Sequence, residues 1–460
     1  MTASQTTPEH VLIVGGGASG VLMAAHLLHQ QDAGTRVTII ERSELLGCGI
    51  AYSTDNPAHM LNTRVTQMSA FPDDPGHFRQ WLDDEGRTVT DQSFVDRGTY
   101  GQYLASLIAP WREGSARLHC VQGECIGLAE TGDGVIASLN DGSTLKADRV
   151  VLATGHAVPA NPAPPLRGGW DFRPPADPAA TVAIIGTGLS MVDHVVTLLR
   201  SGHRGPIFCL SRRGLLPQAH EMGKPLPVRF EDIPLGASVS TVMAWLRGLV
   251  AQAEAMGGTW RDAVDGIRPH VAAIWHHWPL PERARFLRHA ASWWEVHRHR
   301  MPQISANRIS LAIESGQLRI LRGSFIGAEI DSDNRIALSI RDRKTGGLQT
   351  LVADHVIDCR GVRRDPREHA APVVRSLLAD GAARLDKLEL GLDTTTSARV
   401  IDEHGTPSER LFAIGPAARG ALWEITAIPD IRQQVAALAQ NLGRHEQQTE
   451  AEAGSALAAG

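Results

Sequence analysis

The sequence has few cysteines and no long apolar run. Only five cysteines are scattered over 460 residues, and an odd, sparse set is typical of reduced thiols in a cytoplasm rather than of a disulfide framework. No stretch approaches the roughly 18 apolar residues that a membrane helix needs. The polar start, MTASQTTPEH, does not resemble a secretory signal. We therefore expect a cytoplasmic protein with no membrane partner.

Charge excess and several catalytic signatures are also lacking. Lys and Arg number 45 against 50 Asp and Glu, a formal net charge of −5 without a long basic run, so a nucleic-acid partner is not expected. Neither G-x-S-x-G nor a P-loop occurs. The histidines at 276–277 and 297–299 lack the cysteines or carboxylates that would complete a metal site, and arginines surround them. No metal is predicted.

Two glycine-rich turns are present, about 170 residues apart. Residues 11–31 read as an apolar strand, a glycine turn and a helix, and residues 36–42 read as a second strand. Residues 181–202 and 206–213 repeat this plan. A strand, glycine turn and helix in this order predict dinucleotide binding. Because 460 residues exceed one typical core, we expect two or three domains.

The first turn carries the complete G-x-G-x-x-G pattern. In such a turn the first glycine makes the bend, the second lets the backbone approach a pyrophosphate, and the third permits close helix–strand packing. An acid 21 residues after the third glycine is spaced to accept hydrogen bonds from ribose hydroxyls. The predicted contacts are Gly15, Gly17, Ala18, Ser19, Gly20, Glu41 and Arg42.

The second turn keeps two glycines of the pattern and changes the third. Gly186, Gly188 and Ser190 are its candidate cofactor contacts, and Met191 stands in the place of the third glycine. A large side chain must therefore be accommodated between this helix and its strand. The sequence leaves open whether the replacement weakens the second nucleotide site.

The second turn is also followed by a different strand end. Ser211, Arg212 and Arg213 stand where Glu41 and Arg42 end the corresponding strand of the first copy. A carboxylate would repel a 2′-phosphate, whereas a hydroxyl and guanidinium groups attract it. The pattern predicts NADPH rather than NADH. The alternative is that the two arginines are solvated charges at a strand end.

A second internal echo relates residues 116–155 to residues 317–361. Both read as strands with turn signals, then Ala-Asp-x-Val and a strand running into glycine. The first copy ends on Thr154-Gly155, small enough to pass close to a dinucleotide, whereas Arg360 in the second copy has either a phosphate contact or a salt bridge. Cys125 opens one strand of the first copy and is kept as a candidate cofactor contact. Cys120 and Cys125 otherwise read as structural thiols, not a redox pair.

In order along the chain, GCGIAYSTDNPAHMLNTRVTQMSAF, GTGLSMVD, SRRGLLP, HRHRMP and WEITAIPDIR resemble a bacterial group of FAD/NAD(P)-binding proteins. The wider relatives are class B-like flavin monooxygenases, including N-hydroxylating enzymes that act on amines and amino acids. The resemblance implies FAD and NADPH as cofactors. It also implies that the flavin is bordered by Met68, Ser69, Gly415, Trp423 and Thr426, with Asn62, Arg64 and Trp423 as candidates for the flavin face.

The expected fold is α/β, with two Rossmann-like three-layer domains. The expected FAD domain comprises residues 1–170 and 350–460, with a frayed tail after 445. The NADPH domain, 171–349, is inserted into it and contains a helical segment at about 230–310, whose HRHRMP stretch has no assigned role.

The resemblance implies an NADPH- and O2-dependent monooxygenase. It would oxygenate a small nucleophile, such as an amine or amino-acid nitrogen, through a flavin C4a-(hydro)peroxide. A reductase or oxidase that passes electrons to another acceptor stays open, as does a non-catalytic redox sensor that binds both nucleotides. A homo-oligomer is also compatible with the sequence.

Overall fold

The chain forms two compact units. The computed structural model describes residues 8–30, 34–157, 162, 164–170, 173–361 and 365–458, with side chains as far as residue 443. The first unit consists of Met1–Pro57, Thr63–Ala157 and Arg364–Gly460, and the second of Ala58–Asn62 and Val158–Arg363.

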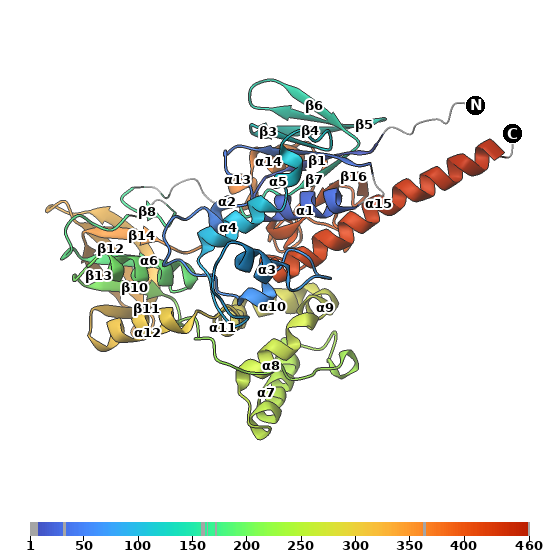
Figure 1. Ribbon diagram of the computed structural model, residues 1–460. Coiled ribbons are helices and arrows are strands. Elements are labelled where there is room, and N and C mark those ends of the chain that lie inside the picture. The colour runs from blue at the N-terminus through green and yellow to red at the C-terminus, as the bar shows by residue number, and fades with distance from the viewer. Residues whose placement is uncertain are drawn as a thin grey trace. The chain divides into compact units, whose positions relative to one another are not determined.

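A six-stranded sheet forms the centre of the first unit (Figure 1), in the order β15-β16-β7-β1-β2-β3. Its strands are parallel except for β15, which pairs antiparallel with β16. Continuous apolar runs such as VLIV in β1 are buried, as expected of parallel strands covered on both faces. The strands are β1 (His10–Val14), β2 (Arg36–Glu41), β3 (Leu118–Gln122), β7 (Arg149–Leu152), β15 (Arg399–Ile401) and β16 (Pro407–Ala413).

Helices and a separate antiparallel meander complete the first unit. Helix α1 follows β1 directly and packs against α15, as Figure 1 shows. The meander, in the order β4-β5-β6, shares a buried apolar cluster with the sheet. Its strands are β4 (Cys125–Thr131), β5 (Gly134–Leu139) and β6 (Thr144–Ala147). The helices are α1 (Ala18–His29), α2 (Gly49–Tyr52), η1 (Val65–Gln67), α3 (His77–Asp84), α4 (Arg97–Ser106), α5 (Ala109–Arg112), α13 (Pro366–His369), α14 (Pro372–Ala379), η4 (Gly415–Ala418) and α15 (Ile428–Ala458).

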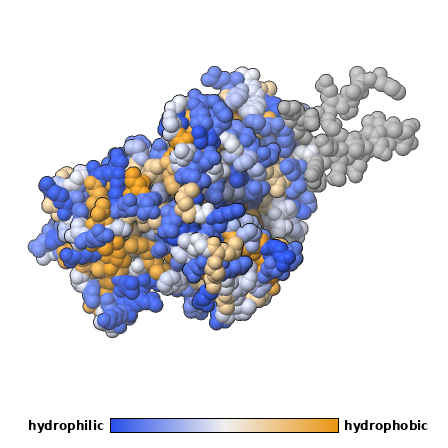
Figure 2. All heavy atoms as spheres, turned by 60° about the horizontal axis from the view of Figure 1, so that its bottom comes forward, coloured by the Kyte–Doolittle hydropathy of each residue, from blue (hydrophilic) through white to orange (hydrophobic). Residues whose placement is uncertain are grey.

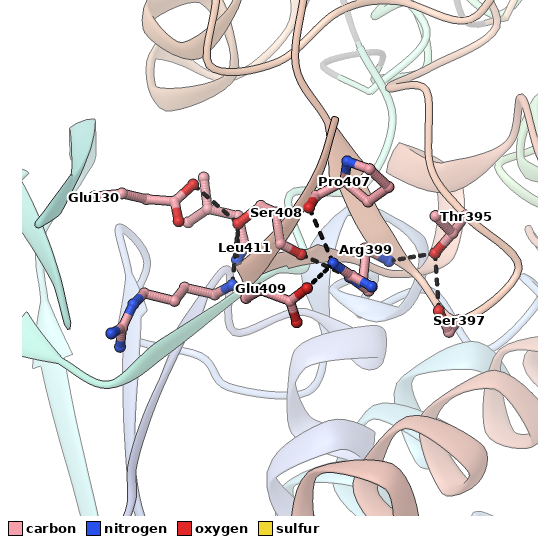
Figure 3. Close-up of polar contacts among 9 residues, drawn as sticks. Glu130, Thr395, Ser397, Arg399, Pro407, Ser408, Glu409 and Leu411 are labelled. Atoms are coloured by element: carbon pink, nitrogen blue, oxygen red, sulfur yellow. Dashed lines mark hydrogen bonds and ion pairs between the residues drawn. The ribbon is translucent and has the colours of Figure 1, made fainter. Parts of the chain in front are cut away.

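Side chains stabilise the β15–β16 hairpin and join it to the meander (Figure 3). Arg399 of β15 donates to the carbonyl oxygens of Ser408, at 2.8 Å, and Pro407, at 3.0 Å, and it pairs with Glu409. The Ser408 hydroxyl donates to Glu130 of β4 at 2.9 Å. Arg399 thus satisfies two carbonyl oxygens of its own hairpin, and Ser408 joins β16 to the meander.

The second unit is built on a seven-stranded sheet in the order β13-β12-β11-β10-β9-β14-β8. The strands β11, β10, β9, β14 and β8 are parallel neighbours, whereas β12 and β13 extend β11 antiparallel. Residues 317–361 thus add their meander to the parallel sheet itself. The strands are β8 (Arg167–Gly168), β9 (Val182–Ile185), β10 (Ile207–Ser211), β11 (Leu318–Ile330), β12 (Ile336–Asp342), β13 (Leu348–Ala353) and β14 (His355–Asp358).

The predicted helical segment lies within the second unit. Helices α6 and α12 belong to the buried cluster of β9 and β10, while α7 to α11 form a separate helical group (Figure 1). The helices are α6 (Leu189–Arg200), η2 (Phe230–Asp232), α7 (Val239–Ala255), α8 (Trp260–Ile267), η3 (Arg268–His270), α9 (Val271–His277), α10 (Leu280–His289), α11 (Ala291–Arg298) and α12 (Gln303–Glu314). Among the described helices none is long and apolar enough to cross a membrane.

The predicted α/β class with two Rossmann-like folds is confirmed, but the boundaries differ from those expected. The sequence placed residues 350–460 in the first domain, whereas β13 and β14 belong to the second sheet and the second unit continues to residue 363. The reason is that β14 pairs with β9 as β7 pairs with β1, so each unit keeps its own closing strand. Residues 58–62 also belong to the second unit, and α15 extends to Ala458 through the tail expected to fray.

Apolar side chains gather on one side of the view in Figure 2, where Figure 1 draws the second unit. Helix α12 of this unit exposes Ile304, Leu311 and Ile313. Exposed apolar patches of this kind occur at protein–protein interfaces. A homo-oligomer nevertheless stays a prediction.

Candidate functional site

The first glycine turn requires glycine at two positions. Gly15 has a φ of +109°, and a Cβ there would lie 2.4 Å from the Ala153 carbonyl oxygen. A Cβ at Gly20 would lie 1.8 Å from the carbonyl oxygen of Gly15. No side chain fits at either position, so the turn can hold β1, β7 and α1 in close contact.

The amino end of α1 is free to face an anion. Its N-cap is Gly17, which makes no side-chain cap, and the first turn contains no acidic residue. The first N–H groups of any α-helix lack an intrahelical acceptor, and here no side-chain cap occupies them, so these groups and the helix dipole favour a phosphate beside them. Ala18 and Ser19 are the first two residues of this helix. Gly49 also lies close to Gly17: a Cβ added at Gly17 would be 3.5 Å from the Gly49 Cα.

Glu41 ends β2 at the edge of this turn. Its Oε2 accepts from the Gly16 backbone N–H at 2.6 Å, and its Oε1 accepts from the Ser43 N–H and hydroxyl at 3.0 Å. An ionised carboxylate has about four acceptor positions. Glu41 is thus held in place and still able to accept from ribose hydroxyls, while Arg42 beside it is exposed.

The late strand β16 returns to the same turn. The Ile414 N–H donates to the Leu152 carbonyl oxygen at 3.0 Å, which continues the pairing of β16 with β7. Gly415 has a φ of +62°, and a Cβ there would lie 2.5 Å from the Ser19 hydroxyl oxygen. Thr154 and Gly155 follow β7. The carboxyl ends of β1, β7 and β16 therefore meet where the strand order reverses, the usual ligand position in such sheets.

Four side chains hold the backbone of the Met68–Ala70 segment. The Tyr100 hydroxyl donates to the Met68 carbonyl oxygen at 3.0 Å, and Arg432 of α15 donates to that of Ser69 at 2.9 Å. The Ala70 N–H donates to the Tyr103 hydroxyl oxygen at 3.0 Å, and the Ala70 carbonyl oxygen accepts from His26 at 3.0 Å. Met68, Ser69 and Ala70 are buried, so these bonds replace the water that an irregular segment would otherwise need.

The three candidates for the flavin face fall in different units. Asn62 belongs to the second unit, where its carbonyl oxygen lies 2.9 Å from His220 Nε2. Arg64 and Trp423 belong to the first. Trp423 is buried, and Arg419 covers one face of its ring at 4.3 Å from the centroid. Thr426 follows in a turn, with its N–H donating to Glu424. Their role at a flavin stays a prediction.

The Cys125 thiol lies in an apolar cluster of the first unit with Leu139 and Val373. Burial raises the pKa of Cys125 to about 11, so the thiol is protonated at neutral pH. A packed, protonated thiol agrees with the structural role that the sequence offered as an alternative for Cys125, whereas Cys120 is exposed. The Cys125 thiol donates to the Gly127 carbonyl oxygen of its own strand at 3.5 Å, and its role as a cofactor contact stays a prediction.

The second glycine turn repeats the first with one change. Gly186 has a φ of +120°, and a Cβ there would lie 2.4 Å from the Cys359 carbonyl oxygen. Gly188 caps α6 without a side-chain bond, and the first turn of α6, which includes the exposed Ser190, has no acid. Met191 is fully buried in the apolar cluster of α6, β9 and β10. The chain thus accommodates the large residue by packing it into the core.

The Arg212–Arg213 pair divides into an exposed and an anchored residue. Arg212 is exposed. The Arg213 guanidinium donates to the Ser292 hydroxyl at 2.6 Å and to the Arg288 carbonyl oxygen at 3.0 Å, which ties the end of β10 to α10 and α11. Ser211 lies beside the turn, with its hydroxyl oxygen 2.9 Å from Thr187 Oγ1 and 3.0 Å from the Gly214 N–H that donates to it.

Arg360, for which the sequence left two roles, forms a salt bridge. Its guanidinium pairs with Asp358 at 2.6 Å and lies 4.8 Å from the centroid of the Phe325 ring. Within HRHRMP, Arg300 is buried and pairs with Asp265 of α8, and His299 lies 3.2 Å from Glu295. Both arginines therefore hold elements of the second unit together. Among the described residues, no group of His, Cys, Asp and Glu could hold a metal ion.

Comparison with known proteins agrees with this geometry. Residues 12–157 match a family model described as FAD-NAD(P)-binding. The predicted resemblance to N-hydroxylating flavin monooxygenases is also confirmed. The chain is 25% identical to an L-aspartate N-monooxygenase (nitrosuccinate-forming) of Streptomyces davaonensis, over 90% of this chain and 74% of that protein.

Solved structures share the fold of this chain. The ornithine N-hydroxylase of Kutzneria sp. 744, described with reduced FAD, NADP+ and L-ornithine, has a TM-score of 0.66 and 14% identity, over 96% of this chain and all of that one. Thioredoxin reductase of Lactococcus lactis has a TM-score of 0.53 and 13% identity, over 95% of this chain and 98% of that one. At these identities the likenesses show the fold, and they do not select the reaction.

Proposed function

We propose that the protein is a single-chain FAD- and NADPH-dependent monooxygenase that oxygenates the nitrogen of a small amine or amino acid. The observation that carries the proposal is the difference between the two nucleotide turns. The strand that follows the first turn ends on Glu41, which is suited to a ribose hydroxyl. The strand that follows the second turn ends on Ser211, and Arg212 comes next; both are suited to a 2′-phosphate. A chain with one site for each dinucleotide can bind both the flavin and its reductant.

In this reaction the amine, O2, NADPH and a proton give a hydroxylamine, water and NADP+. FAD, when bound, supplies the acceptor for hydride and the means of activating O2. The protein binds and orients. The first turn and α1 would hold the FAD pyrophosphate, and Glu41 would accept from its ribose. The hydrogen-bonded Met68–Ala70 segment would border its ring. No general acid or base of the chain is assigned a step.

The similarity to an aspartate N-monooxygenase, which extends over nine-tenths of this chain, supports an amino acid as the substrate. The chief alternative is a reductase or oxidase that passes electrons to another acceptor. The fold of this chain is compatible with this function, because a thioredoxin reductase shares it. We take the enzyme to be cytoplasmic.

Oxygen consumption by the holoenzyme with NADPH separates these functions. L-aspartate and L-ornithine are the first substrates to add, with buffer alone as the control. A monooxygenase consumes more NADPH when the right amine is present and forms a hydroxylamine in proportion. An oxidase converts all consumed O2 to hydrogen peroxide whichever amine is added, and that result would overturn the proposal.

A further inference from the structure

Three arginines from separate elements meet at the end of β10. Arg212 follows the last residue of β10, Arg322 lies on β11, and Arg343 lies in the turn between β12 and β13. Parallel pairing sets Ser211 directly beside Arg322. All three arginines are exposed. Residues more than 100 positions apart in the sequence are therefore neighbours at the carboxyl edge of this sheet.

Backbone and side-chain contacts fix this grouping. The Arg343 N–H donates to the Arg322 carbonyl oxygen at 3.1 Å, and Arg343 Nη1 donates to the Arg212 carbonyl oxygen at 3.3 Å. The Arg322 side chain crosses Gly214, since a Cβ there would lie 2.7 Å from Arg322 Cγ and 3.0 Å from its Nε. Gly214 leaves room for the Arg322 guanidinium next to the strand end.

The positive charge of this group is not neutralised within the described part of the chain. Other arginines of the same sheet have carboxylate partners, as Arg335 has Asp354 and Arg360 has Asp358. None of the described carboxylates forms an ion pair with the three arginines. The nearest in sequence, Asp342, accepts instead from the N–H groups of its own turn, at 2.7 and 2.8 Å.

We propose that Arg322 and Arg343 complete, with Arg212, the site that recognises the 2′-phosphate of NADPH, and that Arg213 does not belong to it. Three like charges held together repel one another, and a dianionic phosphate relieves that repulsion. The end of the strand after a glycine turn is where the adenosine ribose lies in such folds. The two Arg213 Nη atoms already donate to Ser292 and Arg288. The inference rests on the proposed function, because it takes NADPH as the ligand.

The test is calorimetric titration of the FAD-loaded protein with 2′,5′-ADP and, in parallel, with 5′-ADP, which differ by one phosphate. Arg322→Ala and Arg343→Ala should each weaken the binding of 2′,5′-ADP by about tenfold, as expected when one charge-assisted hydrogen bond to phosphate is lost. The affinity for 5′-ADP should not change. Arg319→Ala is the matched control. It removes an exposed arginine three residues earlier in β11, beside Phe208 rather than Ser211, and should alter neither affinity.

Two results would overturn the inference. One is an unchanged 2′,5′-ADP affinity in both variants, and the other is an equal loss for both nucleotides, which indicates a structural effect. If either alanine variant does not fold, Arg322→Gln and Arg343→Gln keep a hydrogen-bonding side chain and remove only the charge, with the same expectation. The titration requires no turnover, so a protein that oxygenates no amine can still confirm the site.

Discussion

The Tyr103 hydroxyl allows a sharp test of the segment proposed to border the flavin. Tyr103→Phe removes one oxygen atom, which accepts from the Ala70 N–H at 3.0 Å and is hydrogen-bonded to His77 Nδ1 at 2.8 Å. Both Tyr103 and Ala70 are 0% exposed, so water cannot replace the lost acceptor. An unsatisfied buried N–H costs about 1–3 kcal/mol, and we expect about 2 kcal/mol here.

The matched control is Tyr52→Phe. The chain has only three tyrosines, and Tyr52 belongs to the same aromatic group, with its ring centroid 5.0 Å from that of Tyr100. Its hydroxyl forms no hydrogen bond among the described residues, so its removal should change stability by less than about 0.5 kcal/mol.

Urea unfolding of the holoenzyme, followed by the fluorescence of released FAD, measures both variants. Tyr103→Phe should lower the unfolding midpoint clearly and Tyr52→Phe hardly at all, at an unchanged denaturant slope. Equal midpoints for the two variants would refute the reasoning, because the Ala70 bond would then contribute nothing to holding the segment.

Three further predictions concern the turns, the anchored arginine and alkaline pH. Gly188→Ala should leave the fold intact, because a Cβ there meets no atom within 4 Å. It should weaken NADPH binding in a titration, because the second glycine of such a turn lets the backbone approach the pyrophosphate. Gly186→Ala, at a φ of +120°, should instead lower the melting temperature. Arg213→Ala should lower the melting temperature and leave the ratio of NADPH to NADH affinity unchanged. Burial raises the pKa of Tyr52 from 10 to about 12. Because the unfolded chain loses its phenolic protons first, stability should fall above about pH 10, and ultraviolet titration should show late ionisation in the native protein.

Both nucleotide turns could be predicted from the sequence, because their requirements are local. At Gly15 and Gly186 a Cβ would clash with the backbone that follows the neighbouring strand, so glycine is required there. This requirement appears in the sequence as glycines at a fixed spacing. Glu41 and Ser211 end strands that follow at nearly equal intervals. The predicted contrast between an acid suited to a ribose hydroxyl and a basic strand end suited to a phosphate follows from these positions.

Contacts between distant segments could not be predicted. The arginines 322 and 343 join the end of β10 only through strand pairing, and no local pattern distinguishes the anchored Arg213 from the exposed Arg212. The clamp on residues 68–70 draws its side chains from α1, α4 and α15. The boundary at 349 was placed too early for a similar reason, since β14 is assigned to its sheet by pairing with β9.

The most direct test of the proposed function is the fate of isotopically labelled O2. The holoenzyme would be incubated with NADPH, labelled O2 and L-aspartate or L-ornithine, and the products analysed by mass spectrometry. An N-oxygenating monooxygenase places one labelled atom on the nitrogen of its substrate for each NADPH oxidised. Labelled hydrogen peroxide alone, with every amine left unmodified, would contradict the account and identify an oxidase.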